Sequence, residues 1–244
     1  MKKIKYGLII AAGKQKRFKE DLPKALVNIN GNCLLDINYN NLLKYCENVF
    51  VVCSQENQSY FDNIYNKIII ESGFGSGDAI LKAFHKLQQL DRFNKEDKCF
   101  IIWGDSLVNE NLYRELIKCK LDNTCIIPCI YENNPYVELI QCKDNIKVLF
   151  SKYGDKISSG YHDMSVFYCS VKYLYSKLNK FYTLVYNEEN KCYNHIHGNE
   201  FEFLDIFNDV DCNGKILEIS KQLKTFSFNT IDELTKYKES INGN

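Results

Sequence analysis

Short apolar runs rich in Ile and Val alternate along the first half of the chain with amphipathic stretches of helical period. Runs of this length predict strands, and apolar residues that recur at spacings of three and four predict helices. The predicted strands span residues 6–12, 49–53, 67–70, 99–103 and 124–130, and the predicted helices span residues 35–45, 57–66, 76–90 and 109–120. Strand and helix therefore follow one another in five β–α type repeats.

The predicted strands are apolar throughout instead of alternating with polar residues. Strands of this kind are buried on both faces, as in a mostly parallel sheet covered by helices. We therefore expect a doubly wound α/β fold, whose ligand binds outside the carboxyl ends of the strands. Four segments meet there: residues 13–24, Ser54, residues 73–77 and the Gly104-Asp105 pair.

The second half of the chain has a different pattern. Residues 136–142 and 146–152 resemble a hairpin around Lys143-Asp144-Asn145, and residues 164–170 predict another strand. A helix is expected near residues 200–210, a strand near 224–228 and a terminal helix from Asp232. These elements indicate a small antiparallel excursion from the parallel sheet.

Composition narrows the function classes. Hydrophobic residues make up 45% of the 244 residues, and 31 Lys and Arg balance 31 Asp and Glu. A neutral balance argues against a nucleic-acid partner, which requires a basic surface. The longest apolar stretches are too short to span a bilayer, and no signal-length segment follows the basic first residues. Eleven cysteines without a C-x-x-C pair predict free, buried thiols and a cytoplasmic location.

The segment after the first predicted strand contains candidate phosphate-binding groups. Small residues, Ala11-Ala12-Gly13, let a ligand approach the backbone N–H groups. Arg17 is one of only three arginines, and its guanidinium suits bidentate phosphate binding. Pro23 fixes the backbone immediately before Lys24. The alternative interpretation is a solvated basic loop.

Several motifs recur in an order that resembles the nucleoside-triphosphate transferase family. The first is Ile9-Ile10-Ala11-Ala12-Gly13-x-x-x-Arg17-Phe18, followed by Pro23-Lys24-Ala25-Leu26-Val27. Gly73-Phe74-Gly75-Ser76-Gly77-Asp78-Ala79 resembles the family turn at the nucleoside, and Phe100-Ile101-Ile102-Trp103-Gly104-Asp105 resembles its strand ending in Gly-Asp. Asn229-Thr230-Ile231-Asp232-Glu233-Leu234 resembles its closing motif. The resemblance covers residues 4–130 and 200–236.

The resemblance implies a Rossmann-like fold and an enzyme that joins an NTP to a phosphorylated acceptor with Mg²⁺ and releases pyrophosphate. It implies one domain over residues 1–244, with a nucleotide-binding core (1–130), an acceptor-side subdomain (131–199) and a closing segment (200–244). The implied catalytic residues are Lys24 and Arg17, and the implied Mg²⁺ ligands are Asp105 and Asn229. The nucleotide is expected on Ala11, Ala12, Gly13, Gly75 and Ser76.

One position departs from the family pattern. The phosphate loop usually reads A-A-G-x-G-[TS]-R, whereas Gln15 and Lys16 stand here in place of the second Gly and the hydroxyl residue. A side chain at Gln15 crowds the phosphates or changes the path of the loop. A nucleotide-binding module without turnover is therefore an alternative. A dinucleotide oxidoreductase is excluded, because Gln15 and Ser54 occupy positions where it requires a Gly and an acidic residue.

The acceptor is less directly readable. Sugar-1-phosphate uridylyltransferases of similar layout carry a Gly in the first middle strand and a Glu near the end of the second. The corresponding positions in this chain fall near Val137 and Ser151-Lys152, so that sugar site is not reproduced. Candidate acceptor ligands are Tyr136, Glu138 and Asp163. The small middle subdomain, the missing sugar signature and the many aromatic residues favour CTP and a small non-hexose acceptor. Enzymes of the phosphocholine type or the phospho-amino-acid type are examples. A UTP- or dTTP-dependent sugar enzyme is the alternative, and the sequence does not specify an oligomeric state.

Two further features have ordinary structural explanations. His195 and His197 flank Ile196 and could bind a metal, but no third ligand is evident, so packing or surface histidines are expected. The tyrosine-rich stretch of residues 161–186 is expected to form core and helix faces, with an aromatic cage for a quaternary amine as the alternative.

Overall fold

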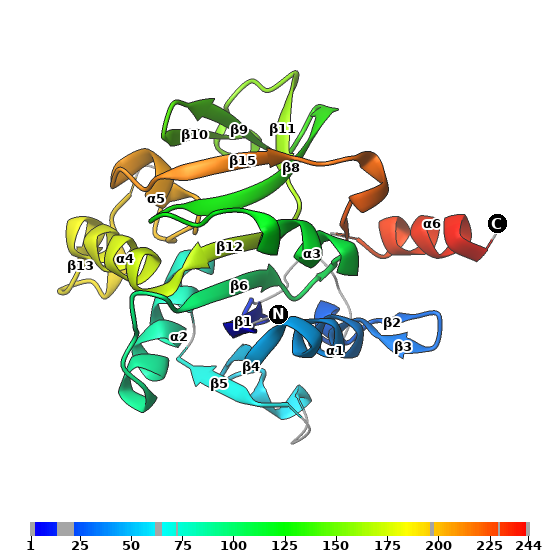
Figure 1. Cartoon of the computed structure of the whole chain (residues 1–244), viewed down its shortest axis with the longest axis horizontal. Helices are drawn as coiled ribbons and strands as arrows, with labels where there is room; N and C mark the ends of the chain where they lie inside the picture. Colours follow the sequence, from blue (N-terminus) through cyan, green and yellow to red (C-terminus); the bar gives the residue numbers. More distant parts are fainter. Residues whose placement is uncertain are drawn as a thin grey trace.

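A ten-stranded sheet forms the centre of the molecule, with strands in the order β10-β9-β11-β8-β12-β6-β1-β4-β5 and β15 paired to β8. The computed structural model describes residues 3–13, 22–61, 65–71, 73–195, 198–228 and 230–242. Figure 1 shows the β9–β11 region at one end of the molecule and β5 at the other.

The first half of the chain forms the parallel part of this sheet. The parallel strands are β1 (Ile4–Ile10), β4 (Cys46–Ser54), β5 (Lys67–Ile70) and β6 (Lys98–Trp103). β1 lies at the centre, because it pairs in parallel with both β4 and β6. These are the apolar segments of the sequence, so the expectation of a parallel sheet is confirmed.

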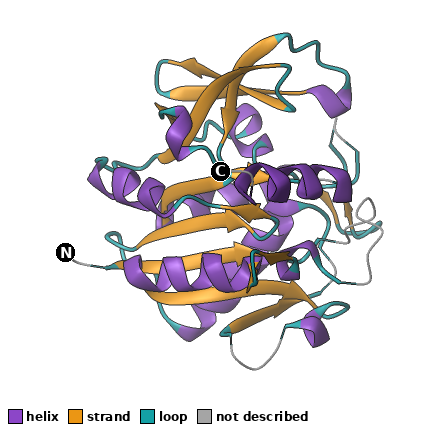
Figure 2. Ribbon diagram, turned by 90° about the vertical axis from the view of Figure 1, so that its right-hand side faces the viewer, coloured by secondary structure: helices purple, strands orange, loops and turns teal. Residues whose placement is uncertain are grey.

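Helices cover both faces of the sheet, as Figures 1 and 2 show. α2 (Ser76–Leu90), α4 (Val171–Val185) and the short α5 (Asp205–Asp209) pack on one face around a large hydrophobic core. α1 (Leu34–Tyr45) and α3 (Glu110–Lys118) pack on the opposite face around a second core. The doubly wound α/β architecture is therefore confirmed.

The other half of the sheet is largely antiparallel. β12 (Val166–Ser170) pairs with β6, and β8 (Cys125–Asn133) pairs with β12 and with β11 (Ser159–Asp163). A hairpin of β9 (Val137–Cys142) and β10 (Asn145–Phe150) continues beyond β11. β15 (Gly214–Glu218) returns in parallel beside β8. The predicted antiparallel excursion is thus present, although the sequence pattern did not reveal β15.

Three two-stranded sheets complete the fold: β2 (Asn28–Ile29) with β3 (Asn32–Cys33), β7 (Ser106–Leu107) with β16 (Phe226–Ser227), and β13 (Tyr186–Asn187) with β14 (Cys192–Tyr193). α6 (Ile231–Asn242) packs near the β2–β3 hairpin through a small core that includes Ile29, Phe228 and Leu234. The closing segment of the chain is therefore anchored to the first part of the molecule.

Two predicted helices are wrong in extent. Between residues 57 and 61 the chain forms only a 3-10 turn, η2 (Gln58–Tyr60). Asn57 accepts a hydrogen bond from the Ser54 backbone N–H at 2.8 Å, which turns the chain as local side-chain bonds commonly do. The predicted helix at 200–210 shrinks to α5, because the Phe201–Phe203 segment is used to cover another turn, as described below.

The eleven cysteines are free thiols, seven of them buried. Cys99, Cys169 and Cys125 lie side by side across β6, β12 and β8. Burial raises the pKa of the Cys169 thiol well above its ordinary value. Among the helices that the structure describes, none combines the length and the apolar character needed to cross a membrane.

Candidate functional site

Lys24 lies near the carboxyl ends of the parallel strands, because its ammonium lies beside Asp105, which follows the end of β6. Pro23 is extended and precedes a single 3-10 turn, η1 (Lys24–Leu26), closed by a hydrogen bond from Leu26 N–H to the Pro23 carbonyl. The Lys24 side chain is buried, with 6% of its surface exposed. Its ammonium lies 3.4 Å from Asp105 Oδ2 and donates to the Phe228 carbonyl at 3.1 Å. A buried cation is thus fixed beside a carboxylate at the predicted edge.

Asp105 follows the end of β6, at the position the sequence suggested. The Gly104 N–H bonds the Ile10 carbonyl at 2.9 Å, and a Cβ on Gly104 would lie at the same distance from that oxygen. Only glycine therefore lets β6 end this close to β1. The Asp105 side chain is 40% exposed, so a solvated ion or ligand can reach its carboxylate.

A buried amide supports the chain after Asp105. Asn38 of α1 donates to the Ser106 carbonyl at 2.7 Å and accepts from the Val108 N–H at 3.3 Å. Sequence reasoning missed this residue, although a signal was present. Asn38 is a polar residue on the apolar stripe formed by Leu35 and Leu42, where a side chain without partners is costly.

The closing segment reaches the same place through β16. Phe226 pairs with Leu107, and Ser227 with Ser106. Phe228 is buried, and its carbonyl accepts the Lys24 hydrogen bond. The structure therefore brings Lys24, Asp105 and Phe228 together. Asn229, the predicted second metal ligand, lies outside the described residues.

Ala11 and Ala12 are buried at the end of β1, and Gly13 is exposed after them. Asn57 connects this segment to the loop after β4, because its amide donates to the Ala11 carbonyl at 2.9 Å. Sequence reasoning did not single out Asn57, because it lay within a predicted helix. Arg17 and Gln15 lie outside the described residues.

We expect Asn57→Ala to raise the KM for the NTP about fivefold, since a lost hydrogen bond of about 1 kcal/mol would let the start of the phosphate segment move. Steady-state kinetics at varied NTP would measure it. Gln58→Ala is the matched control, because among the described residues the Gln58 amide bonds within its own loop, to the Gln55 carbonyl. An unchanged KM in Asn57→Ala would contradict this positioning role.

Gly75 and Ser76 lie in a turn that the Phe201–Phe203 segment covers. Gly75 has a φ of +103°, and a Cβ there would lie 2.4 Å from the Phe201 carbonyl oxygen. The Ser76 hydroxyl donates to Glu202 Oε2 at 3.0 Å and accepts from the Phe203 N–H at 2.9 Å. Asp78 completes the support by accepting hydrogen bonds from the Phe74 N–H and the Tyr193 hydroxyl. These contacts constrain the backbone of the turn.

We expect Gly75→Ala to lower the free energy of unfolding by about 3 kcal/mol, combining backbone strain with a clash against fixed backbone. Gly154→Ala is the control, because Gly154 has a similar φ of +98° but open space where its Cβ would be. Strain alone should cost the control about 1 kcal/mol. Equal losses in urea unfolding would show that Phe201 does not constrain the turn.

The three candidate acceptor ligands do not share one face. Tyr161 pairs with Leu139, so Asp163 lies on the Leu139 face of the β9–β11 sheet and Glu138 on the opposite face. Asp163 is buried and accepts a hydrogen bond from the Ser165 N–H at 2.9 Å. Tyr136 is 42% exposed, outside the sheet. The structure therefore separates Glu138 from Asp163.

Glu138 lies on the face that also carries His162 and Glu132. His162 Nδ1 is 2.6 Å from one oxygen of Glu132, and the Lys224 ammonium is 2.9 Å from the other. Burial opposes the charge on Glu132, but these two partners outweigh it and lower the pKa of its carboxyl. This network attaches the segment that leads into β16.

Sequence reasoning missed a pair of charged residues beside the Gly75 turn. The Lys152 ammonium, in η3 (Ser151–Tyr153), bonds to Glu202 Oε1. The same carboxylate accepts from Ser76, so one contact joins three segments that are distant in sequence. In the sequence, Lys152 stands out only as a replacement for a family Glu, because pairing across 50 residues leaves no local pattern.

His195 is a packing residue. Its side chain is 5% exposed, its ring lies against Phe181, and its Nε2 is 3.2 Å from Asp209. His197 lies outside the described residues. Within the described ranges, no group of three His, Cys, Asp or Glu is placed to hold a metal ion. A single carboxylate such as Asp105 nevertheless fits Mg²⁺, which usually takes one or two protein carboxylates and completes its shell with phosphates and water.

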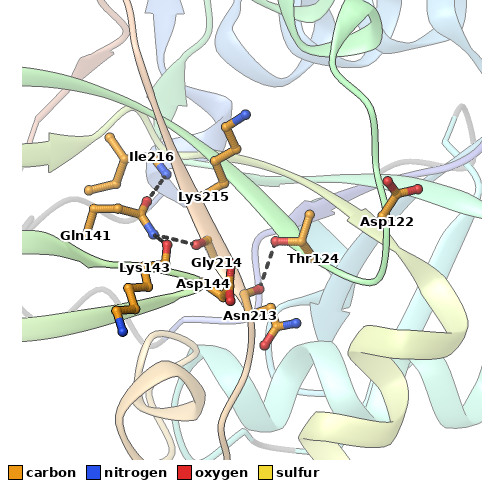
Figure 3. A pocket seen from close by; sticks show the side chains of 9 residues that line it. All are labelled: Asp122, Thr124, Gln141, Lys143, Asp144, Asn213, Gly214, Lys215 and Ile216. Carbon is orange, nitrogen blue, oxygen red and sulfur yellow. Dashed lines mark hydrogen bonds between the residues drawn. The ribbon is translucent and has the colours of Figure 1, made fainter.

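A hollow of about 470 Å³ lies at the opposite edge of the sheet, where β8 and β15 begin (Figure 3). The Gln141 amide bridges its walls, donating to the Gly214 carbonyl and accepting from the Ile216 N–H. Lys143, Lys215 and Asp122 lie around it without pointing toward one another. This hollow is far from Lys24 and Asp105, which follow the carboxyl ends of the strands.

Comparisons with known proteins identify the family and the fold. The family model of the MobA-like NTP transferase domain matches residues 7–153. HddC from Yersinia pseudotuberculosis has a similar fold, with a TM-score of 0.67 and 18% identity over 98% of this chain and 100% of its own. A second structure of HddC, complexed with GMP-PN, has a TM-score of 0.67 and 19% identity over 98% of this chain and 100% of its own.

The inositol-1-phosphate CTP transferase from T. maritima is also similar, with a TM-score of 0.67 and 16% identity over 98% of this chain and 95% of that chain. At these identities the similarity establishes the fold alone. No curated protein matches the sequence.

Proposed function

Because this chain belongs to the MobA-like NTP transferase domain family and is therefore a nucleotidyltransferase, we propose that it transfers a nucleotidyl group from CTP to a small phosphorylated acceptor. The observation that carries the proposal is the buried Lys24 ammonium, 3.4 Å from Asp105 at the carboxyl ends of the strands. That is the edge where ligands bind in doubly wound sheets.

In the proposed reaction, an oxygen of the acceptor phosphate attacks the α-phosphorus of the NTP. A new P–O bond forms as the bond to the β-phosphate oxygen breaks, and pyrophosphate leaves. Lys24 and Arg17 offset the negative charge that develops on the phosphoryl oxygens. Ala11, Ala12 and Gly13 present backbone to the phosphates, and Gly75 and Ser76 lie beside the nucleoside.

Asp105 and Asn229 are the proposed ligands of Mg²⁺, which would supply further charge neutralisation at the phosphates. The exposure of Asp105 supports this assignment, because 40% of its side chain is accessible and a hydrated ion can reach the carboxylate. The cytosine base is proposed by analogy alone, as the inositol-1-phosphate CTP transferase of similar fold is named for CTP.

The test is a matrix of CTP, UTP, dTTP, ATP and GTP against a panel of phosphorylated acceptors with Mg²⁺, read as pyrophosphate release and as product mass. One productive pair identifies base and acceptor together. Transfer from UTP or dTTP to a sugar phosphate would replace the CTP assignment. NTP binding without pyrophosphate across the panel would favour a module that binds nucleotide without turnover, and Gln15→Gly would then test the phosphate loop.

A further inference from the structure

The Lys152–Glu202 pair contacts the turn that we propose lies beside the nucleoside. Trp103, two residues before Asp105, packs its ring against Phe203 with centroids 6.0 Å apart. Phe203 follows Glu202 directly, and Glu202 contacts Ser76 of the nucleoside turn. The pair therefore connects the nucleotide side to η3, which follows the β9–β10 hairpin of the acceptor side.

Asp163 belongs to the same side of the sheet. The sheet face that carries Asp163 on β11 also carries Leu139 on β9, and Val148 and Phe150 on β10. Phe150 is the residue immediately before η3. The Ser165 N–H bonds Asp163 Oδ1, and the Ser165 carbonyl accepts from the Trp103 N–H at 3.1 Å. Asp163 and Glu202 are therefore each one residue or one hydrogen bond removed from a neighbour of Trp103: Ser165 for Asp163 and Phe203 for Glu202.

Both members of the pair are partly accessible, with 27% of the Lys152 side chain and 20% of the Glu202 side chain exposed. A carboxylate that accepts one bond on each oxygen keeps further acceptor sites, and an ammonium with one carboxylate partner keeps further N–H groups. Hydroxyls on adjacent carbons of an acceptor match this arrangement, because a hydroxyl can donate a hydrogen bond to the Glu202 carboxylate and accept one from the Lys152 ammonium.

The charge of Lys152 is persistent. Burial disfavours the charge, but the Glu202 carboxylate outweighs burial and raises the pKa of the ammonium above its usual range. The Tyr153 ring lies under the ammonium, with its centroid 4.6 Å away. The face of the Tyr153 ring beside this pair is therefore occupied by the Lys152 ammonium and is not open to a cationic ligand.

We infer that Lys152 and Glu202 determine acceptor specificity by binding adjacent hydroxyls of a phosphorylated polyol, a sugar or cyclitol phosphate, and that they exclude acceptors bearing a quaternary ammonium. This inference rests on the proposed nucleotidyl transfer. It narrows the acceptor class expected from the sequence, because a quaternary ammonium has no N–H to donate to Glu202 and is repelled by Lys152.

The experiment compares myo-inositol 1-phosphate and glucose 1-phosphate with phosphocholine as acceptors, using the NTP that gives product. The wild type should use at least one polyol phosphate with a kcat/KM at least about 100-fold above that for phosphocholine, since sites built to bond hydroxyls reject analogues that lack them. Preferential transfer to phosphocholine would overturn the inference while leaving the transferase function standing. Absence of pyrophosphate with every acceptor, together with absence of NTP binding, would instead refute the proposed function.

Glu202→Gln and Lys152→Gln should each raise the acceptor KM about tenfold or more and change the NTP KM less than about threefold. Glu200→Gln and Lys156→Gln are matched controls, because both residues are exposed and close in sequence. Thermal unfolding of each variant checks that it is folded. If Glu202→Gln does not fold, Lys152→Gln carries the test.

Monodeoxy acceptors separate recognition from a structural role. Removing the hydroxyl that Glu202 binds should cost the wild type about tenfold in kcat/KM and cost Glu202→Gln little, because the interaction is already lost. Equal losses in both enzymes for every deoxy position would show that the pair only ties segments together, and would overturn the inference.

Discussion

Asp105→Asn should reduce kcat by about 1000-fold or more while the protein stays folded, since it removes a charge that the proposed metal and phosphates require. Its side chain is 40% exposed, so little packing is lost. The measurements are kcat at saturating NTP and acceptor, and binding of Mn²⁺ with NTP followed by electron paramagnetic resonance. Both activity and Mn²⁺ affinity should fall together.

Asp122→Asn is the matched control for this substitution. Asp122 also pairs with a lysine, Lys120, at 2.8 Å, but lies at the opposite edge of the sheet. It should leave kcat unchanged. An Asp105→Asn enzyme with wild-type kcat would remove Asp105 from the proposed metal site.

Lys24→Met should lower kcat by about 100- to 1000-fold with a smaller effect on the NTP KM, because the ammonium offsets charge that grows toward the transition state. Methionine keeps most of the buried aliphatic length. Loss of the hydrogen bond to the Phe228 carbonyl should also cost about 1–3 kcal/mol of stability.

Lys67→Met separates these two effects. The Lys67 ammonium also bonds a backbone carbonyl, that of Phe61, at 2.8 Å, but Lys67 is at the start of β5. The control should lose stability and keep kcat. If Lys24→Met raised only KM, Lys24 would bind the ground state of the nucleotide without assisting transfer.

Much of the fold could be predicted because its signals are local. The apolar strands of the parallel sheet and the amphipathic α2 follow directly from short-range patterns. Carboxyl ends of parallel strands meet at one edge, so the sequence also anticipated that Asp105 would approach the segment containing Lys24.

The failures have a common physical origin in contacts between distant segments. Where a helix was expected from residue 57, the described residues 57–61 form a turn, and Asn57 ties it to Ala11, 46 residues away. Lys152 and Glu202 meet only because η3 and the segment before α5 both approach Ser76. Neither partner carries a local pattern, so no inspection of one segment could have paired them.

The hydrogen bond from Lys24 to Phe228 spans 204 residues of sequence. During synthesis, the nucleotide-binding half leaves the ribosome long before the segment that contributes Phe228. A nascent chain that has not yet reached Phe228 therefore carries the motifs of the first half without the carbonyl that fixes Lys24. We expect the proposed transferase activity to appear only after the Phe228 segment has emerged and packed against Lys24.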